Sequence, residues 1–413
     1  MTPTSTASKW FNDPVHGFIE VPEGLLLELI DHPYVQRLAR IRQMGMATVV
    51  YPGAIHTRFH HALGAMHLMA GALETLRRKG VPLRPEEIEA TLAAILLHDI
   101  GHGPFSHGLE KLLLPGITHE AMSLGIMLAL NRQLKGRLAL AIEIFTGSYN
   151  RRFLHALVAS QLDMDRMDYL LRDAFFTGVP DGVVGVERLV KTLNVVDDQL
   201  VVEHKGIYSV EKFLVARRLM YWQVYLHKTS VAAESMLIHA IQRARVLLGR
   251  GVALEVPENL RWALTLPARD EALAPEAIPQ EWIERFVQLD DHDIVFALKC
   301  WAHAKDPILA ELATRLLNRR LLKLRFRNTP VQPDDLQRLR ETYKTGYRWD
   351  DEAVPYFVFA GKSTNRAYIK GADKPIYIRF KSGELLDLVA ASDLANIEAY
   401  TEQVTKYYLC TPD

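Results

Sequence analysis

The chain has 413 residues, of which 49% are apolar, and its 49 basic side chains are balanced by 49 acidic ones. This length predicts a main domain with a smaller attachment, and the balance of charge excludes a bulk attraction to nucleic acid or membranes. Cys300 and Cys410 lie far apart in the sequence, which argues against disulfides and against a cysteine metal site.

Targeting and membrane signals are missing from the sequence pattern. The first nine residues lack an apolar signal core, and no run approaches the ~18 apolar residues that a membrane helix requires. The two cysteines also fit a reducing compartment. We therefore expect a cytoplasmic protein without membrane contact.

Helical periodicity dominates the first 250 residues. The segment 61–80 is amphipathic, with basic residues in its last turn and Gly80 as a stop, and the segment 84–99 opens with Pro85 and two glutamates. Further helices are predicted near 119–132, 137–146, 151–160 and 163–176, and one long helix near 209–249.

Strand signals are few and lie mainly near the C-terminus. The run LNVVDDQLVV predicts a hairpin that turns at Asp197 and Asp198, and short aromatic runs occur in YFVFAG, AYIKG and PIYIRFKSG. The proline-rich segment 257–279 is expected to connect a helical body to a smaller lobe. The predicted fold is mainly α, with a helical core and a smaller C-terminal α+β lobe.

Histidines are concentrated in one region, since eight of the sixteen lie between His56 and His119. Taken singly, His56 and His67 are expected to be capping or core residues. The pair His98-Asp99 is different because it ends a strongly apolar helix, where an unpaired carboxylate is costly to desolvate. A divalent cation removes that cost, and imidazole with carboxylate suits zinc, iron or manganese.

Two ligands are too few for a metal site, so others must come from elsewhere in the chain. His61, at a loop-to-helix junction, is the best upstream candidate, and Asp165 is the best downstream one. In the segment 163–176, helical spacing places Asp165, Asp168 with Tyr169, and Arg172 with Asp173 on one face. Such a face is often only solvated surface, but the other candidate ligands favour a functional site.

The order H…HD…D resembles the signature of the HD-domain phosphohydrolases. The phrases NDPVHGFIEV, YPGAIHTRFHHALG, LLHDIGHGPFSH, THE and DMDRMDYLLRD follow one another as in deoxynucleoside triphosphate triphosphohydrolases. The resemblance is strongest to the branch with the vertebrate sterile-alpha-motif and HD-domain enzyme and its bacterial relatives. It covers residues 9–250 and continues more weakly to about 330. We expect a disordered tail at 1–8, an HD core at 9–250, a helical extension at 251–330 and a small α+β lobe at 331–413.

This resemblance implies a reaction in which water attacks the α-phosphorus of a dNTP and releases deoxynucleoside and inorganic triphosphate. It implies a divalent metal (Mn, Fe, Mg, Zn or Ni) held by His61, His98, Asp99 and Asp165. It implies catalytic roles for His102, His107, Glu110 and His119. Glu110 stands where the family has an aspartate, and its longer side chain is still expected to orient an imidazole.

Substrate contacts carry over from the resemblance to Gln43, Arg58, Arg166, Tyr169, Asp173, Arg217, Tyr221 and Tyr225. A guanidinium at position 58 grips phosphate oxygens bidentately. Arg166 replaces a lysine of the best-known relative, which keeps the charge but changes the geometry. Tyr221 replaces a histidine, so different contacts to the base are expected. Arg217 and Tyr225, taken alone, are also compatible with a helix-surface arginine and a core tyrosine.

An effector site that binds a nucleotide between subunits is implied less completely. The matching positions are Lys9, Asn12, Asp31, Gln36, Arg188, Arg319, Leu321 and Lys323. Ala39 and Glu203 stand where arginines are expected, and Phe18 replaces a histidine, which weakens a triphosphate pocket. A dimer or a tetramer is expected from the same resemblance.

Other functions remain open from the sequence. Related HD phosphohydrolases act on nucleoside mono- or diphosphates, cyclic dinucleotides or alarmones while keeping the same metal ligands. A sensor of nucleotides or single-stranded nucleic acid without turnover is a further alternative, although the complete ligand set argues against it. Base preference and physiological role, whether control of dNTP pools or defence against phage, are not determined by the sequence.

Overall fold

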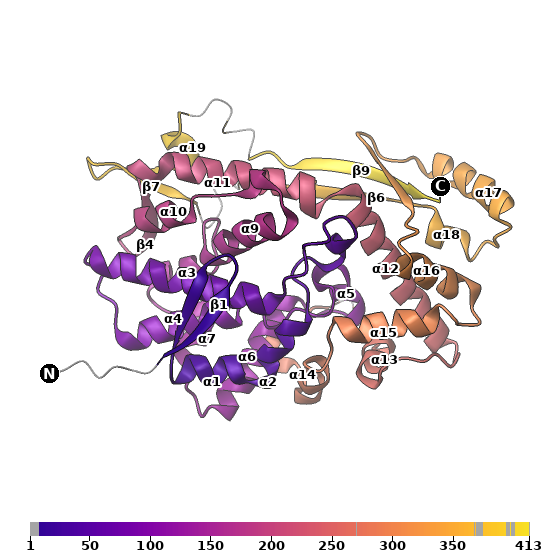
Figure 1. Cartoon of the computed structure of the whole chain (residues 1–413), viewed down its shortest axis with the longest axis horizontal. Helices are drawn as coiled ribbons and strands as arrows, with labels where there is room; N and C mark the ends of the chain where they lie inside the picture. The colour runs from indigo at the N-terminus through magenta and orange to yellow at the C-terminus, as the bar shows by residue number, and fades with distance from the viewer. Residues whose placement is uncertain are drawn as a thin grey trace.

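The structure is a computed structural model that describes residues 8–269, 271–366, 368, 375–393, 397 and 401–412, without the side chain of His107. Figure 1 shows a mainly helical body with strands at its edges. The predicted tail at 1–8 lies outside the described residues except for Ser8, and of the run AYIKG only Tyr368 is described. The predicted mainly α fold, with a smaller sheet-containing C-terminal region, is confirmed.

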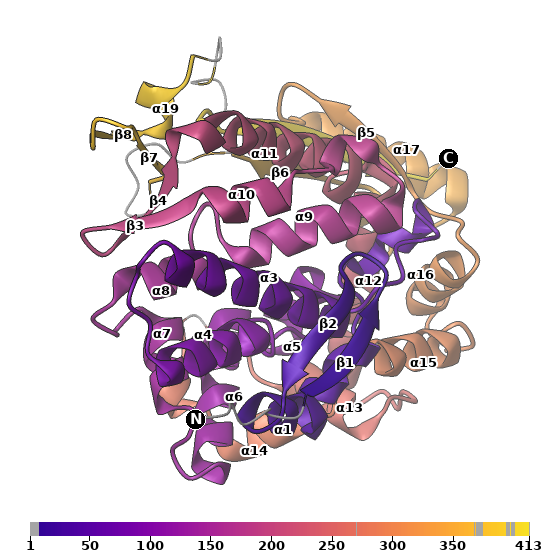
Figure 2. The ribbon, with the colours of Figure 1, turned by 60° about the vertical axis from the view of Figure 1, so that its left-hand side comes forward.

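Three helices form the centre of the body: α3 (Arg58–Arg78), α4 (Pro85–Leu97) and α9 (Met164–Thr177). α3 packs against both α4 and α9 (Figure 2). α4 is almost continuously apolar and is buried from Ala90 to Leu97. Its start follows the sequence signals, since Pro85 occupies the first turn and the Glu87 side chain accepts a hydrogen bond from the Arg84 backbone N–H at 2.9 Å.

The predicted helices around this centre are present with ends shifted by up to two residues. They are α6 (His119–Gln133), α7 (Ala139–Thr146) and α8 (Arg152–Val158). Seven further helices of the described chain are short or peripheral: α1 (Leu25–Asp31), α2 (Pro33–Gln36), α5 (Glu110–Leu113), α10 (Val186–Thr192), α17 (Pro333–Tyr347), α18 (Val354–Phe357) and α19 (Leu388–Ala391).

The single long helix predicted near 209–249 is wrong. The structure has α11 (Ile207–Met220), a π-helical turn at Tyr221–Tyr225 and then α12 (Lys228–Gly249). His227 begins the second helix, because its ring accepts a hydrogen bond from the Thr229 N–H at 3.2 Å. The apolar pattern continues through the break, so periodicity alone did not reveal it.

The proline-rich segment 257–279 was predicted to connect the helical body to a smaller lobe. The structure instead places it in the body. It contains α13 (Glu258–Thr265), which buries Leu260, Ala263 and Leu264 and contacts α12. Three more helices of the body follow it: α14 (Gln280–Phe286), α15 (Asp291–Trp301) and α16 (Pro307–Leu317). Burial of its apolar face therefore keeps this segment within the helical body.

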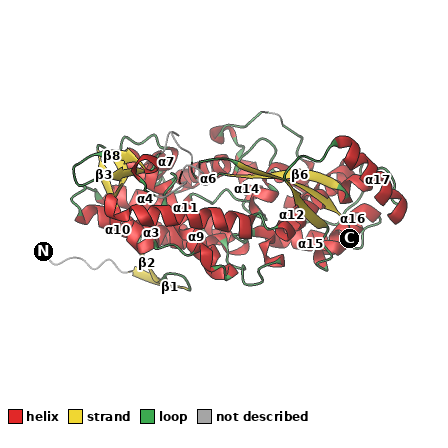
Figure 3. Cartoon of the chain, turned by 90° about the horizontal axis from the view of Figure 1, so that it is seen from above, coloured by secondary structure: helices red, strands yellow, loops and turns green. Residues whose placement is uncertain are grey.

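The strands of the described residues form three small sheets, and strands are yellow in Figure 3. β1 (Ser8–Asp13) and β2 (Gly17–Pro22) make an N-terminal hairpin, and β3 (Leu193–Val196) and β4 (Gln199–Glu203) make the predicted hairpin. The latter turns through Asp197 and Asp198 at φ 47° and 62°, a left-handed conformation that aspartate tolerates.

The C-terminal strands join sheets that begin earlier in the chain. β7 (Tyr377–Arg379) pairs in parallel with β4 and is followed by β8 (Leu385–Asp387). β9 (Val404–Thr411) lies between β5 (Lys323–Arg327) and β6 (Phe359–Asn365). The predicted domain boundary at 330/331 stays a prediction, and two sheets contain strands from both sides of it.

Among the described helices, none combines the length and apolarity that crossing a bilayer requires.

Arg37 joins the loop after α4 to the chain before α15. The side chain is fully buried, and its guanidinium donates hydrogen bonds to the backbone carbonyls of Leu289 at 2.7 Å, Ile100 at 3.3 Å and His102 at 2.8 Å. Burial lowers the pKa of Arg37 to about 9, although the charge of nearby Asp290 acts in the opposite direction. The side chain therefore stays a cation at neutral pH and satisfies carbonyls that no water reaches.

We predict that Arg37→Met lowers the free energy of unfolding by roughly 3 kcal/mol, because three buried carbonyls lose their donor. Urea denaturation followed by circular dichroism measures this change. Arg137→Met is the matched control, since Arg137 pairs with Glu28 at 2.6 Å on the surface and is expected to change little. Equal losses in both variants would contradict the prediction.

Candidate functional site

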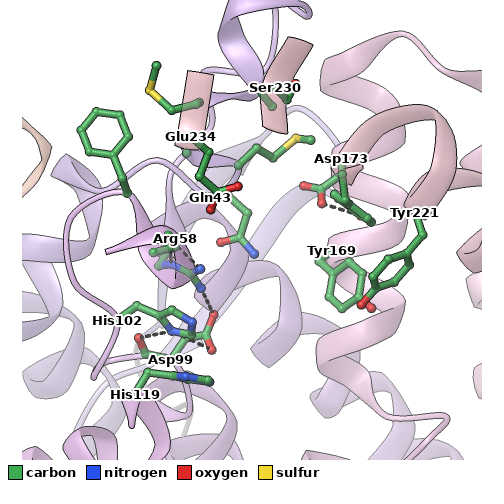
Figure 4. A pocket seen from close by; sticks show the side chains of 18 of the residues that line it. Gln43, Arg58, Asp99, His102, His119, Tyr169, Asp173, Tyr221, Ser230 and Glu234 are labelled. Carbon is green, nitrogen blue, oxygen red and sulfur yellow. Dashed lines mark hydrogen bonds and ion pairs between the residues drawn. The ribbon is translucent and has the colours of Figure 1, made fainter. Parts of the chain in front are cut away.

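A cavity of about 440 Å³ opens between α9, the π-helical turn, α12 and the loops that precede α3 and α5. This volume is in the range of small-molecule sites. All eight predicted substrate contacts line it: Gln43, Arg58, Arg166, Tyr169, Asp173, Arg217, Tyr221 and Tyr225. Figure 4 shows Asp99, His102 and His119 together at one end of the cavity, and Tyr169 and Tyr221 along its side.

The four predicted metal ligands converge at this end from three elements. His61 Nε2 lies 3.3 Å from His98 Nε2, 3.1 Å from Asp165 Oδ1 and 3.7 Å from Asp99 Oδ2. His98 Nε2 lies 3.4 Å from Asp99 Oδ1 and 3.5 Å from Asp165 Oδ1. A cation with bonds of ~2.1 Å separates adjacent ligand atoms by roughly 3.0–3.4 Å. The distances between 3.1 and 3.7 Å are close to this range, so small shifts of the side chains would let the donor set hold one divalent ion.

Hydrogen bonds at the other ring nitrogens turn both histidines toward the centre. His98 Nδ1 lies 2.6 Å from the Ile95 carbonyl oxygen, and His61 Nδ1 lies 2.8 Å from Asp168 Oδ2. Both contacts require a proton on Nδ1, which leaves Nε2 to point inward as the ligand atom. This arrangement of a carbonyl or carboxylate behind each imidazole is typical of metal-binding histidines.

The electrostatic environment attracts positive charge. Burial alone would lower the pKa of His61, but hydrogen bonds with Asp165 and Asp168 outweigh it and raise that pKa to about 10. The pKa of Asp165 is lowered, since burial is outweighed by the hydrogen bonds with His61 and His98. Both carboxylates of the set, Asp99 and Asp165, are therefore ionised, as cation binding requires. His61, His98 and Asp99 form a cluster that can hold a divalent metal.

Arg58 lies at the first turn of α3 and points into the cavity (Figure 4). Its guanidinium donates to an Asp99 oxygen, and to Ser106 Oγ at 2.7 and 2.9 Å. Ser106 is held in a left-handed conformation with φ 55°. Asp291 fixes the loop around Ser106 to the segment before α3. Its carboxylate accepts hydrogen bonds from the backbone N–H groups of Phe105 at 2.9 Å and Arg42 at 3.0 Å.

The predicted catalytic residues lie beside the metal-ligand cluster, as far as they are described. The rings of His102 and His119 are 4.1 Å apart between centroids, and Glu110 Oε2 lies 2.8 Å from His119 Nδ1. Glu110 therefore contacts an imidazole, as expected for this position. Burial, with Arg58 nearby, lowers the pKa of His102 to about 3, so this ring is neutral near pH 7. His107 lies in a short 3-10 turn, and its side chain is outside the described residues.

An aromatic wall with an acidic group borders the cavity. Tyr225 donates to Asp173 Oδ2 at 2.7 Å, and His56 Nε2 lies 2.7 Å from Asp173 Oδ1. The Tyr169 ring lies 6.2 Å from that of Tyr225 between centroids. His56 is thus the core residue that the sequence predicted, and it also holds Asp173 in place.

Two polar atoms of residues that line the cavity have unused hydrogen-bonding capacity. Gln43 Oε1 and Arg166 Nε are buried and have no partner among the described residues. Arg166 pairs through another nitrogen with Asp163, and Arg217 lies 6.0 Å from the centroid of the Tyr221 ring. A ligand with both donors and acceptors would satisfy these groups.

The predicted effector positions lie in three separate groups. In the first group, Lys9 and Asn12 lie on β1, and Lys9 is 3.7 Å from Asp31 at the end of α1. Gln36 lies at the end of α2, which follows α1. Arg188 lies on α10, and Arg319, Leu321 and Lys323 lie between α16 and β5. Figure 1 shows α10 and α16 on opposite sides of the chain. An effector site that uses all of them stays a prediction that requires more than one copy of the chain.

Several residues of the site were not found from the sequence. Ser230 and Glu234 of α12, and Met44 and Met46 before α3, line the cavity. Behind the metal ligands, Asp168 contacts His61 and also accepts hydrogen bonds from His16, far away in the sequence, and from Arg172 of its own helix. For Asp168, the helical spacing from Asp165 to Arg172 was the only sequence signal. For Ser230 and Glu234 of α12, the sequence contained no signal.

Comparisons with known proteins agree with this geometry. Residues 58–173 match the HD domain family, and residues 184–248 match the HD associated region. The uncharacterized protein YwfO of Bacillus subtilis is 34% identical over 327 residues, which cover 76% of this chain and 71% of the relative.

Two further relatives have descriptive names. The deoxynucleoside triphosphate triphosphohydrolase SAMHD1 homolog of Dictyostelium discoideum is 31% identical over 272 residues, covering 61% of this chain and about half, 52%, of that protein. The crystal structure of a phosphohydrolase from Bacteroides thetaiotaomicron has a TM-score of 0.93 and 46% identity, and the match covers 98% of this chain and 100% of that one.

We predict that Gly64→Ala lowers the free energy of unfolding by roughly 2–3 kcal/mol. A Cβ at this position of α3 would lie 2.0 Å from Asp168 Oδ1 and 2.2 Å from Arg172 Nη2, and these side chains are held by other partners and cannot move without cost. Gly71→Ala is the control on the same helix, because its Cβ would meet only Val190 at 4.0 Å. It is expected to gain roughly 0.5–1 kcal/mol by helix propensity. Urea denaturation of both variants tests the difference.

Proposed function

Because the chain belongs to the HD-domain phosphohydrolases, we propose that it hydrolyses deoxynucleoside triphosphates to deoxynucleoside and inorganic triphosphate. One observation carries this proposal: the eight expected substrate contacts line the same cavity as Asp99 and Asp165. Relatives named as dNTP triphosphohydrolases support it at about 30% identity. The chain spans about half the length of these relatives.

The charges of the cavity suit a triphosphate. Three guanidiniums, those of Arg58, Arg166 and Arg217, line it. Each can bind phosphate oxygens, and a fork-shaped guanidinium does so bidentately. The aromatic wall around Tyr169 then lies where a deoxyribose follows the phosphates, with Asp173 and Gln43 as partners for its hydroxyl group.

The proposed reaction forms a bond from a water oxygen to the α-phosphorus and breaks the bond from that phosphorus to the 5′ oxygen. The water loses a proton and the leaving 5′ oxygen gains one. A divalent cation held by His61, His98, Asp99 and Asp165 would polarise a phosphoryl oxygen, and Mn, Fe, Mg, Zn and Ni are candidates.

The side chains around the phosphates have separate tasks. Arg58 neutralises charge that develops on the phosphate oxygens. His102 is neutral and contacts phosphate as a hydrogen-bonding group, and His119 is oriented by Glu110. His107 is assigned as the acid for the leaving oxygen.

We further propose that the protein works as a dimer or tetramer and that a nucleotide effector binds between copies. The three groups of matching positions lie on different parts of one chain, which an assembly can bring together. The substitutions at Ala39 and Glu203 alter the charge of this site, and Glu203 pairs with Lys79 and Lys205 at 2.8 and 2.6 Å. The effector of this chain therefore differs from the nucleotide that a pocket with arginines at positions 39 and 203 would bind.

The direct test uses anaerobically purified protein with Mn²⁺ and each dNTP, alone and in pairs, with products separated by chromatography. We expect deoxynucleoside and triphosphate, and turnover at background level in Asp165→Ala, which loses a metal ligand. Glu143→Ala removes an exposed carboxylate of α7 and is expected to retain parental activity. Faster turnover in mixtures would indicate an effector. Metal binding without turnover of any dNTP would refute the proposal and favour another phosphorylated nucleotide.

A second prediction concerns the sugar. Tyr169→Ala removes a half-buried ring from the cavity wall and makes room for a 2′-hydroxyl group. We expect the ratio of kcat/KM for dATP over ATP to fall at least tenfold, or about 1.4 kcal/mol. Tyr221→Phe keeps its ring and should leave this ratio unchanged. An unchanged ratio in Tyr169→Ala would mean that other residues exclude ribose.

A further inference from the structure

The turn of the N-terminal hairpin, residues 13–17, reaches the back of the metal-ligand cluster although it is about 45 residues before His61 in the sequence. We propose that this turn is a positioning device for the metal centre: it holds Asp168, and Asp168 fixes the ring of His61. The inference rests on the metal-binding part of the proposed function and is independent of the substrate.

Asp168 is the central acceptor of this device. Its Oδ1 accepts hydrogen bonds from His16 Nε2 at 2.7 Å and Arg172 Nη2 at 3.0 Å. Its Oδ2 accepts from His61 Nδ1 at 2.8 Å and Arg172 Nε at 2.9 Å. With four donors on two oxygens, the carboxylate has a single orientation, and the His61 ring takes its orientation from it.

The hairpin turn holds Asp168 in two ways. His16 contacts it directly, and Asp13 holds Arg172, whose Nη1 lies 2.7 Å from Asp13 Oδ2. Asp13 is itself fixed, because its Oδ1 accepts from the Val15 and His16 backbone N–H groups at 2.9 Å each. One short turn therefore supplies one partner of Asp168, His16, and holds a second, Arg172.

Burial makes these contacts strong and their loss costly. Arg172 and Asp168 are fully buried, and Asp13 is 7% exposed. The helix α3 has Gly64 at the point where Asp168 and Arg172 pack on it, so the network lies directly against the helix that carries His61. Charges in such surroundings interact through a low dielectric, and removing one partner leaves the others uncompensated.

The turn that positions Asp168 lies outside the part of the chain that matches the HD domain. The HD domain match begins at residue 58, so the turn belongs to a segment outside it. The hairpin packs against α3 (Figure 2). Lys9 and Asn12, two of the predicted effector positions, lie on β1 of the same hairpin. A displacement of β1 would therefore reach His61 from Asp13 through three successive hydrogen bonds, by way of Arg172 and Asp168.

A buried ion network could instead serve stability alone, and the chain provides a matched control for that role. Arg243 is buried and pairs with Asp306 at 2.6 and 3.0 Å, and Asp306 also accepts from the Leu309 backbone N–H at 2.8 Å. Asp306→Asn thus repeats the chemical change of Asp13→Asn on α16.

The experiment measures Mn²⁺ binding by calorimetry, and thermal unfolding without metal, on full-length metal-free protein with no nucleotide present. We expect both Asp13→Asn and Asp306→Asn to lower the Tm. Only Asp13→Asn should weaken Mn²⁺ binding, by about tenfold, while Asp168→Asn weakens it by roughly 10–100-fold. The double variant Asp13→Asn/Asp168→Asn should bind Mn²⁺ no more weakly than Asp168→Asn alone, because both act on His61.

Parental Mn²⁺ affinity in Asp13→Asn, with a Tm lowered as in Asp306→Asn, would overturn the proposal. His16→Gln provides a second variant that keeps the pair of Asp13 and Arg172. It should also weaken Mn²⁺ binding, and if Asp13→Asn does not fold, parental affinity in His16→Gln would overturn the proposal instead. Because no nucleotide is used, failure here is distinct from failure of dNTP hydrolysis.

Discussion

The carboxylate of Asp168 is the interaction on which the rest of the site depends. It is fully buried and accepts hydrogen bonds from His61 of α3, from Arg172 of its own helix and from His16 of the N-terminal hairpin. A charge in this position is costly to bury, and the loss of any partner destabilises it. The requirement brings three segments of the chain together, and the metal-ligand face of His61 is a consequence.

Around this point the cavity has a clear polarity. Carboxylates and imidazoles gather at one end, guanidiniums lie beside them, and tyrosines form the wall beyond (Figure 4). These three kinds of side chain are complementary to a cation, a phosphate chain and a sugar, in that order along the cavity. The broken helix is part of this arrangement, because the π-helical turn places Tyr221 and Tyr225 on the cavity wall, where a continuous helix would orient them differently.

The C-terminal region stabilises the body from outside the cavity. β7 extends the sheet that begins with the hairpin of β3 and β4, and β9 joins β5 to β6. Strand pairing between segments up to about 180 residues apart in sequence cannot be read from local patterns, because any exposed strand edge is a possible partner. This is why composition alone did not reveal that the C-terminal strands pair with strands earlier in the chain.

The sequence by itself determined the helical class, most helix positions and the candidate metal ligands. Apolar spacing reports which face of a helix is buried, and His98-Asp99 at the end of an apolar helix requires a partner for its charge. Only the tertiary structure decided which distant groups meet: Asp13 with Arg172, His56 with Asp173, and Ser230 and Glu234 with the cavity. These contacts depend on the path of the chain between the residues, and hydrogen bonds formed across such distances leave no periodic signal in the sequence.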